Sequence, residues 1–192
     1  MCRPIGYGFS AFASGHIQIL GSLNKKSGTK KLVEFLEKHK FGTDCRILDV
    51  GSGTGLVGVE LKKLNNTNLD ALEPSKKSVE IARSKVLYKN FFVELLGPDK
   101  QLSIPSNTYD AAICIAVFVP GHVKAEGAMD EMARVVKPGG LVCFSIRDDG
   151  HEAKMAEMCD KKVWKLLSNT KEPYGPRGVY HSECYMFVYQ VL

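Results

Sequence analysis

Apolar and polar residues follow two different periods along this chain from about residue 27 onward. Short, almost continuous apolar runs predict seven strands, at residues 46–50, 68–73, 91–96, 109–117, 141–147, 164–170 and 180–192. Between most of them, apolar residues spaced three or four positions apart predict helices, at residues 29–42, 55–64, 74–86, 124–136 and 151–162. The run at 109–117 is nearly all apolar, which is typical of a parallel strand buried on both faces.

The helical patterns also predict which side chains face the core. In the helix at 55–64 we expect a buried stripe of Leu56, Val59 and Leu64. Pro74 and Ser75 open the next helix, because proline suits the first helical turn and serine caps it. The inward side chains of that helix are expected to be Val79, Ile81, Ala82 and Val86.

The order of these elements predicts one α/β domain. Helices that alternate with strands are typical of a doubly wound, mostly parallel sheet. The last two strands have only a loop rich in Pro and Gly between them, so we expect them to close the sheet as an antiparallel hairpin. The domain covers residues 27–192, whereas residues 1–26 form a weakly patterned N-terminal segment rich in Gly and Ser.

Composition narrows the class of protein. With 44% hydrophobic and 24% charged residues, the chain is an ordinary globular protein. The net charge of +5 is mild, and its Lys clusters lack interleaved aromatic residues, so they indicate solvated helix faces rather than a nucleic-acid surface. No apolar run approaches the length of a membrane span, and Gly, Ser and His interrupt the N-terminal stretch that could act as a secretory signal.

The cysteines indicate a reducing compartment. They are scattered without a C-x-x-C pair, so we expect reduced thiols and no metal site. The cytoplasm is the expected location, with the nucleus as an alternative. The six residues are Cys2, Cys45, Cys114, Cys143, Cys159 and Cys184.

The stretch "ILDVGSGTGLVG", residues 47–58, carries the first chemical signal and can be read in two frames. Gly53, Gly55 and Gly58 spell G-x-G-x-x-G, which is the fingerprint of dinucleotide sites. Counted from Asp49, the same residues spell D-x-G-x-G-x-G through Gly51, Gly53 and Gly55. Both frames place glycines where the chain turns sharply and its backbone approaches a ligand.

Asp49 favours the second frame, whereas Glu73 indicates an adenosine and is shared by NAD and SAM sites. Asp49 lies inside the strand, where its carboxylate would repel a pyrophosphate at the following helix N-terminus but suits a cationic ligand. S-adenosylmethionine (SAM) has no phosphate and carries an ammonium and a sulfonium group. Glu73, at the end of the second strand, can accept both ribose hydroxyls of an adenosine. Asp49 can equally brace the loop by accepting hydrogen bonds from its N–H groups, and Gly58 lets the next helix pack on the sheet.

Four segments resemble, in order and spacing, the class I SAM-dependent methyltransferases. They are "ILDVGSGTG", "LDALEPS", "SNTYDAAICIAVF" and "ARVVKPGGLVCFSI", and the resemblance covers roughly residues 30–192. Within this superfamily, residues 137–143, Arg147 and Trp164 resemble the methyltransferase-like subfamily of the Williams-Beuren syndrome region. The resemblance implies a Rossmann-like, seven-stranded sheet, with SAM as cofactor and S-adenosylhomocysteine (SAH) as product.

The resemblance also implies a set of cofactor contacts. The glycine loop would lie against the methionine part, Glu73 would hold the ribose, and the end of the fourth strand would line the sulfonium and methyl groups. The residues at matching positions are Asp49, Gly51, Ser52, Gly53, Gly55, Glu73, Pro74, Leu96, Gly97, Ile115 and Ala116.

The chain departs at two places from the pattern of the family that it resembles. Many relatives have an Asp that binds the adenine amino group where this chain has Pro98, and Asp99 follows. The subfamily also has an aromatic, Tyr-Asp-rich segment ahead of the first helix that covers the cofactor. The stretch "GYGFSAFASG" offers Tyr7, Phe9 and Phe12 there without a Tyr-Asp pair.

The acceptor side carries fewer signals. Methyl transfer from a sulfonium depends mainly on alignment, so no catalytic residue is required by the pattern. His122 is the candidate base and Arg147 the candidate contact for an anionic substrate, with a solvent-facing histidine and a surface salt bridge as the alternatives. "AVFVPG" lacks the Asn/Asp-Pro-Pro-aromatic run of nucleic-acid amino-methyltransferases, so a small molecule is the expected acceptor.

Three alternatives stay open from the residues alone. One is a SAM- or SAH-binding protein without turnover that serves as a partner subunit. The others are a protein methyltransferase and a dinucleotide oxidoreductase that uses the first frame. Neither the accepting atom nor the oligomeric state follows from the sequence.

Overall fold

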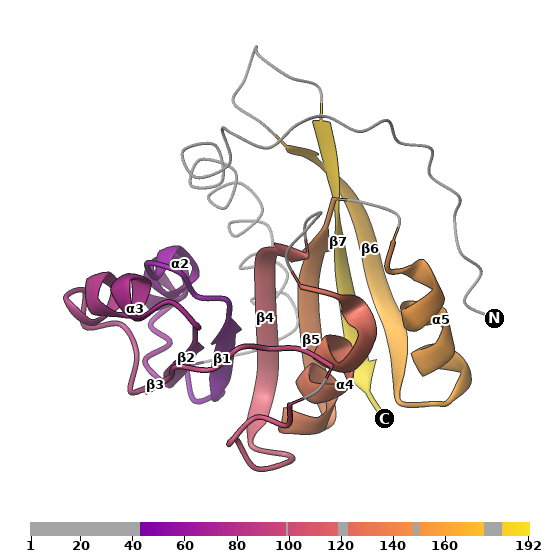
Figure 1. The fold of residues 1–192 in the computed structure, drawn as a ribbon, viewed down its shortest axis with the longest axis horizontal. Helices are drawn as coiled ribbons and strands as arrows, with labels where there is room; N and C mark the ends of the chain where they lie inside the picture. The colour runs from indigo at the N-terminus through magenta and orange to yellow at the C-terminus, as the bar shows by residue number, and fades with distance from the viewer. Residues whose placement is uncertain (1–42, 99, 119–122, 148–149, 175–181) are drawn as a thin grey trace.

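The computed structural model describes residues 43–98, 100–118, 123–147, 150–174 and 182–192. Within them, seven strands form one sheet in the order β3-β2-β1-β4-β5-β7-β6 (Figure 1). The strands are β1 (Ile47–Val50), β2 (Leu69–Leu72), β3 (Asn90–Phe92), β4 (Tyr109–Phe118), β5 (Val136–Ile146), β6 (Trp164–Tyr174) and β7 (Ser182–Val191). The helix expected at 29–42 and the domain boundary at 26/27 lie outside the described residues.

The pairing confirms the predicted topology. Strands β3, β2, β1, β4 and β5 are parallel, whereas β7 pairs antiparallel with both β5 and β6. The chain therefore has the predicted α/β fold, a seven-stranded and mostly parallel sheet that ends in an antiparallel hairpin.

Helices cover both faces of the sheet (Figure 1). Alternate residues of a strand face opposite sides, so Ile47 packs in one core with helix α2 (Leu56–Lys63). Leu48 packs in the other core, with α4 (Ala125–Val135) and α5 (Glu152–Asp160). Helix α3 (Lys76–Arg83) connects β2 to β3, and Ser75 caps it as expected by accepting the N–H of Ser78 at 3.3 Å. This is the doubly wound arrangement that the alternating pattern predicted.

Some inward faces were predicted wrongly. The buried residues of α2 are Val57, Gly58 and Leu61, whereas Leu56 and Val59 are only half-buried. Leu64, the third residue expected in the stripe, is partly buried and packs against the core. In the next helix Val79 and Ala82 are buried as expected, but Ile81 is 44% exposed and Val86 is 79% exposed. Val86 lies beyond the end of α3 and has a φ of 50°, so the helical period does not extend to it.

Two strand ends also differ from the prediction. The third strand stops at Phe92, so residues 93–96 leave the sheet instead of extending it. Between β4 and β5, Tyr109 pairs with Val136 and Ala111 pairs with Leu141, so the "KPGG" run at 137–140 bulges out of the ladder. These four residues, which separate the helix expected at 124–136 from the strand expected at 141–147, therefore lie inside β5.

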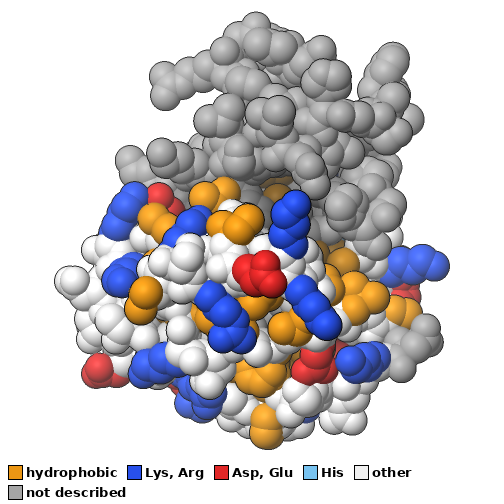
Figure 2. Space-filling model, turned by 60° about the vertical axis from the view of Figure 1, so that its left-hand side comes forward, with side chains coloured by type: hydrophobic (Ala, Val, Ile, Leu, Met, Phe, Trp, Pro, Cys, Tyr) orange, Lys and Arg blue, Asp and Glu red, His pale blue; other side chains and the backbone are white. Residues whose placement is uncertain are grey.

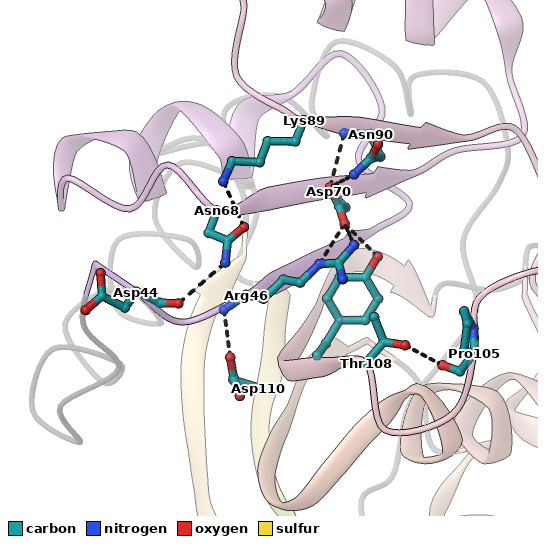
Figure 3. A network of polar contacts seen from close by, with 10 residues as sticks. Asp44, Arg46, Asn68, Asp70, Lys89, Asn90, Pro105, Thr108 and Asp110 are labelled. Atoms are coloured by element: carbon teal, nitrogen blue, oxygen red, sulfur yellow. Dashed lines mark hydrogen bonds and ion pairs between the residues drawn. The ribbon is translucent and has the colours of Figure 1, made fainter.

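A buried carboxylate fastens the amino-terminal ends of four strands (Figure 3). Asp70 of β2 is 1% exposed and accepts from Arg46 Nε at 3.1 Å and Nη2 at 2.7 Å. It also accepts the hydroxyl of Tyr109 on β4 at 2.9 Å, together with the backbone N–H and side-chain amide of Asn90 on β3 at 3.1 and 2.8 Å. Five hydrogen bonds to one buried anion compensate for its desolvation.

Removing this carboxylate should destabilise the sheet. Asp70→Ala leaves Arg46 and Asn90 without their acceptor, and we expect a loss of about 3 kcal/mol in the free energy of unfolding. Tyr109→Phe removes a single hydrogen bond to the anion and should cost about 1.5 kcal/mol. Urea unfolding followed by the fluorescence of Trp164, the single and buried tryptophan, measures both. Losses below about 0.5 kcal/mol for both variants, the usual range of surface changes, would contradict the stabilising role.

A second carboxylate predicts how stability depends on pH. Asp110 accepts the N–H of Arg46 at 2.8 Å and pairs with Lys137 at 2.7 Å. Burial raises the pKa of Asp110, but the hydrogen bonds from Lys137 and Arg46 outweigh it, so the pKa lies below its usual value. Because the pKa is lower in the folded state, the contribution is complete above the unfolded value of about 3.9 and is lost at lower pH.

We therefore expect the free energy of unfolding to fall as the pH drops below about 4, with Asp110 contributing to the slope. Lys137→Met should flatten part of this dependence, because it removes the ion pair that lowers the pKa. Urea unfolding at a series of pH values tests this, and identical slopes for the two proteins would exclude the Asp110–Lys137 pair as a source.

Candidate functional site

The turn between β1 and α2 consists of residues 51–55, here called the glycine loop. Gly51, Gly53 and Gly55 have φ angles of 66°, 55° and 87°, in the left-handed region that favours glycine. A Cβ atom on Gly51 would lie 2.3 Å from Cγ2 of Val117. Glycine at 51 is therefore required both by the backbone conformation and by the close approach of the loop to the end of β4.

The end of β2 holds this loop in place. The N–H groups of Gly51 and Ser52 donate to the carbonyl of Leu72, at 2.8 and 3.2 Å. Glu73 accepts the N–H of Gly53 with Oε2 and the N–H of Ser75 with Oε1, both at 2.9 Å. Each carboxylate oxygen has further lone-pair capacity, so Glu73 can brace the loop and still accept the hydroxyls of a ligand.

A cavity of about 330 Å³ lies beside the glycine loop. It is at the carboxyl ends of β1, β2 and β4, the edge at which open α/β sheets bind ligands. Six residues predicted to bind the cofactor line it: Gly51, Gly53, Glu73, Pro74, Leu96 and Ala116. Its other lining residues are Val50, Leu72, Glu94, Leu95, Val117 and Val123.

Glu94 gives the cavity a second carboxylate beside Glu73. Its side chain is 15% exposed, accepts two hydrogen bonds from Ser103 and lies 3.5 Å from Lys100. Burial raises the pKa of Glu94, but the hydrogen bonds from Ser103 and the nearby Lys100 outweigh it and hold the pKa below its usual value. Two carboxylates among the lining residues favour a ligand that carries positive charge.

The two residues at the end of β4 that were predicted to line the methyl group have different surroundings. Ala116 has a φ of 58° and lines the cavity, and its N–H donates to Ser145 Oγ at 2.8 Å. Ile115 is 3% exposed and packs in the core on the α2 side of the sheet. Of these two residues, therefore, only Ala116 lines the cavity.

The segment after β3 forms another wall. Leu96 is 6% exposed and lines the cavity, whereas Gly97 is not among the lining residues and has open space where a Cβ would be. Pro98 packs against the first turn of α4, since a Cβ on Gly127 would lie 2.2 Å from its Cα atom. Pro98 thus contacts α4 at the position where many relatives have an Asp.

Three predicted cofactor residues in or next to the glycine loop are buried and are not among the residues that line the cavity. Asp49 is 1% exposed, and its Oδ2 accepts the hydroxyl of Tyr88 at 2.5 Å. Gly55 is buried, and a Cβ there would lie 3.1 Å from Leu87. Ser52 is 1% exposed, and its hydroxyl oxygen makes no hydrogen bond within the described residues, so a polar ligand group could satisfy it.

The structure says less about the acceptor side. His122, the predicted base, and Asp99 lie outside the described residues. Arg147 directly follows β5 at the carboxyl edge of the sheet and is partly buried, but it is not among the residues that line the cavity.

Sequence reasoning missed several residues of the site. Some of them could have been found from the sequence, and others could not. Val50 and Leu72 adjoin predicted positions and could have been found from the strand ends. Glu94 and Leu95 were assigned to a strand that ends at Phe92, so their position in the cavity wall was missed. No sequence signal pointed to Tyr88, because its hydrogen-bond partners Gly58 and Asp49 are 30 and 39 positions away.

The described residues outside the cavity also bear on the sequence predictions about charge, metals and membranes. Figure 2 shows the side that carries α2 and α3, where the Lys and Arg side chains are spread among uncharged ones. In the described part of the chain, no cluster of three or more His, Cys, Asp or Glu residues is arranged to hold a metal ion. None of the described helices is both long and apolar enough to cross a membrane.

Comparisons with known proteins agree with this geometry. A family profile described as a methyltransferase domain matches residues 47–140. Human methyltransferase-like protein 27 is 32% identical over 120 residues, which cover 62% of this chain and 48% of that protein. Ribosomal protein L11 methyltransferase of Thermotoga neapolitana is 27% identical over 144 residues, 75% of this chain and 52% of that protein. The chain thus spans about half the length of these curated relatives.

Solved structures show the same fold. Magnesium protoporphyrin IX methyltransferase from Synechocystis PCC 6803, crystallised with bound SAM, matches with a TM-score of 0.70 and 14% identity. The match covers 95% of this chain and 87% of that chain. At this identity the likeness establishes the architecture and leaves the ligand to be argued from the residues themselves.

Because of the contact between α2 and Tyr88, we expect a glycine-to-alanine substitution, which usually stabilises a helix, to destabilise this protein. Alanine normally favours a helix over glycine by about 1 kcal/mol, so Gly58→Ala should stabilise α2 on propensity alone. A Cβ at Gly58 would, however, lie 2.5 Å from the Tyr88 hydroxyl oxygen and 2.6 Å from Cζ. We expect the clash to dominate and Gly58→Ala to lower the urea midpoint.

Gly97→Ala is the matched control for this measurement. It also adds a Cβ to a glycine, but nothing lies within 4 Å of that position, so stability should stay within about 0.5 kcal/mol of the unmodified protein. A Gly58→Ala protein as stable as the Gly97→Ala protein would show that the ring of Tyr88 moves away without cost.

Proposed function

This chain belongs to the class I SAM-dependent methyltransferase superfamily, and on that premise we propose that it transfers a methyl group from SAM to a small-molecule acceptor. The superfamily, the enzyme class and SAM as the cofactor agree with the sequence predictions and are confirmed. The acceptor and the activity of the whole protein are our proposal. The observation that carries it is the cavity between the glycine loop and Glu73, at the carboxyl edge of the sheet.

The residues around this cavity suit the parts of SAM. The glycine loop offers close backbone approach and the buried hydroxyl of Ser52 to the amino-acid part. Glu73 has lone pairs for the ribose hydroxyls, and Pro74 and Leu96 offer apolar surface to the adenine, with Gly97 at its edge. When bound, SAM supplies a methyl group made electrophilic by the attached sulfonium.

The chain's own task is alignment and exclusion of water. Ala116, with Ile115 beside it, would fix the place of the methyl group at the end of β4. The apolar side chains of Val117 and Val123 line the cavity and reduce access of water to that point. An in-line displacement needs little more than this, because holding two groups in register removes much of the entropic cost of their encounter.

Two residues are proposed to act on the acceptor. His122 would remove a proton when the accepting atom carries one, and Arg147 would pair with an anionic group. Leu95, which is 60% exposed at the cavity, offers apolar surface that suits a small organic molecule. The scattered cysteines support a reducing compartment such as the cytoplasm as the place of action.

Cofactor binding gives the first test. Isothermal titration calorimetry should detect saturable binding of SAM and SAH and none of NAD, because the carboxylate of Asp49 opposes a pyrophosphate at the N-terminus of the following helix. Glu73→Gln should weaken SAM binding about tenfold, since it removes a charged acceptor worth more than about 1.4 kcal/mol. Glu80→Gln, on the exposed face of α3, is the control and should bind normally. Saturable NAD binding without a response to SAM would overturn the proposal.

The acceptor is tested by transfer of a labelled methyl group. SAM labelled in its methyl group is incubated with the protein and either a small-molecule extract or a protein extract. Label in the small-molecule fraction supports our proposal. Label in protein contradicts it and supports a protein acceptor, the kind of acceptor named for the ribosomal relative. SAM binding without any transfer to either fraction would identify a binding subunit instead.

A further inference from the structure

The ring of Tyr88 occupies a space beneath the glycine loop that two glycines leave for it. A Cβ on Gly55 would lie 3.3 Å from its Cε2 atom, and a Cβ on Gly58 only 2.5 Å from its hydroxyl oxygen. That hydroxyl accepts the N–H of Gly58 at 3.2 Å and donates to Asp49 Oδ2 at 2.5 Å. Tyr88 therefore joins the end of β1 to the first turn of α2 by one hydrogen bond on each side.

The residues around Tyr88 hold the same loop. Lys85 Nζ donates to the carbonyl of Thr54 at 2.6 Å, and Leu87 lies 3.1 Å from the position of a Cβ on Gly55. Lys62 of α2 in turn donates to the carbonyl of Val86 at 3.2 Å. Residues 85–88 thus form a support on which the glycine loop rests, on the side away from the cavity.

The charge in this arrangement is that of Asp49. It is 1% exposed and stands two residues before Gly51, whose backbone lines the cavity. A buried carboxylate acts through a medium of low dielectric, so its field reaches further than that of a surface charge. Burial first, and then the charge of Asp49, raises the pKa of Tyr88, which keeps its hydroxyl protonated as a donor.

A second pair of a tyrosine hydroxyl and a buried carboxylate lies at the amino edge of the sheet, in different surroundings. At the amino edge, Tyr109 donates to Asp70, but there Arg46 also binds the carboxylate and the cavity is at the opposite edge. The pair at the amino edge serves stability. The pair at the carboxyl edge lies directly beneath the loop that faces the ligand.

We propose that Tyr88 is a positioning residue that fixes the carboxylate of Asp49 beneath the glycine loop, so that its negative charge acts on the ammonium-bearing amino-acid part of SAM. The inference rests on the proposed function and assigns a specificity role to a residue outside the cavity wall. It predicts an effect on ligands that carry the amino-acid part and none on ligands that lack it.

The test compares three ligands on Tyr88→Phe, which keeps the ring and removes only the hydroxyl. SAM and SAH carry the amino-acid part, whereas 5′-methylthioadenosine keeps the adenosine and a thioether but lacks it. We expect the Kd of SAM and of SAH to rise about fivefold to tenfold, as for a lost hydrogen bond to a charged group, and the Kd of 5′-methylthioadenosine to stay unchanged. Tyr109→Phe, which removes the matching hydroxyl at the other edge, should leave all three constants unchanged.

Two results would overturn the inference while leaving the proposed function intact. Equal weakening of all three ligands would mean that Tyr88 only supports the shape of the loop. Unchanged binding of all three would mean that its hydroxyl contributes to folding alone. Failure of the unmodified protein to bind SAM would instead remove the proposed function, and the inference with it.

A second variant keeps the inference testable if Tyr88→Phe does not fold. Asp49→Asn removes the charge at nearly constant volume and should produce the same selective loss for SAM and SAH. In the double variant the two effects should not add, because both remove the same interaction, and additive losses would show that Tyr88 and Asp49 act separately.

Discussion

The close approach of the glycine loop to the ends of β1, β2 and β4 is the constraint on which the rest of the site depends. Because Gly51 leaves no room for a side chain against Val117, the backbone itself forms one wall of the cavity. The same approach brings Glu73 within reach of the N–H of Gly53, so the acidic strand end and the loop fix each other. Without these contacts the cavity would lose a backbone wall and a correctly placed acceptor together.

Each edge of the sheet contains a buried carboxylate that accepts a tyrosine hydroxyl, but the two carboxylates have different surroundings. At the amino edge, Asp70 gathers hydrogen bonds from neighbouring strands and is bonded to Arg46, which stabilises the register. At the carboxyl edge, Asp49 accepts the hydroxyl of Tyr88 beneath the loop that lines the cavity. A buried anion thus serves cohesion at one edge and lies where it can influence binding at the other, which separates stability from function within one sheet.

Much of the fold followed from local pattern, and the failures have physical causes. The parallel pairing and the closing hairpin follow from alternation of elements, because parallel neighbours need crossovers and consecutive strands without a helix between them can pair directly. The buried face of α2 was predicted wrongly for two reasons. Apolar residues flank that face on both sides, and a glycine such as Gly58 gives no hydrophobic signal even when it is buried. Glu94 was missed because its strand ends early, at Phe92, and the following residues turn toward the cavity.

The sequence by itself determined the class of fold and the cofactor, since these depend on elements and motifs whose residues stand close together in the chain. Gly51, Gly53 and Glu73 could be assigned because a turn and a strand end impose local requirements on conformation and charge. Only the tertiary structure decided that Asp49 lies under the loop instead of on the cavity wall, and that Tyr88 holds it there. The reason is that packing joins residues distant in the chain, and no local period or spacing encodes which of them meet.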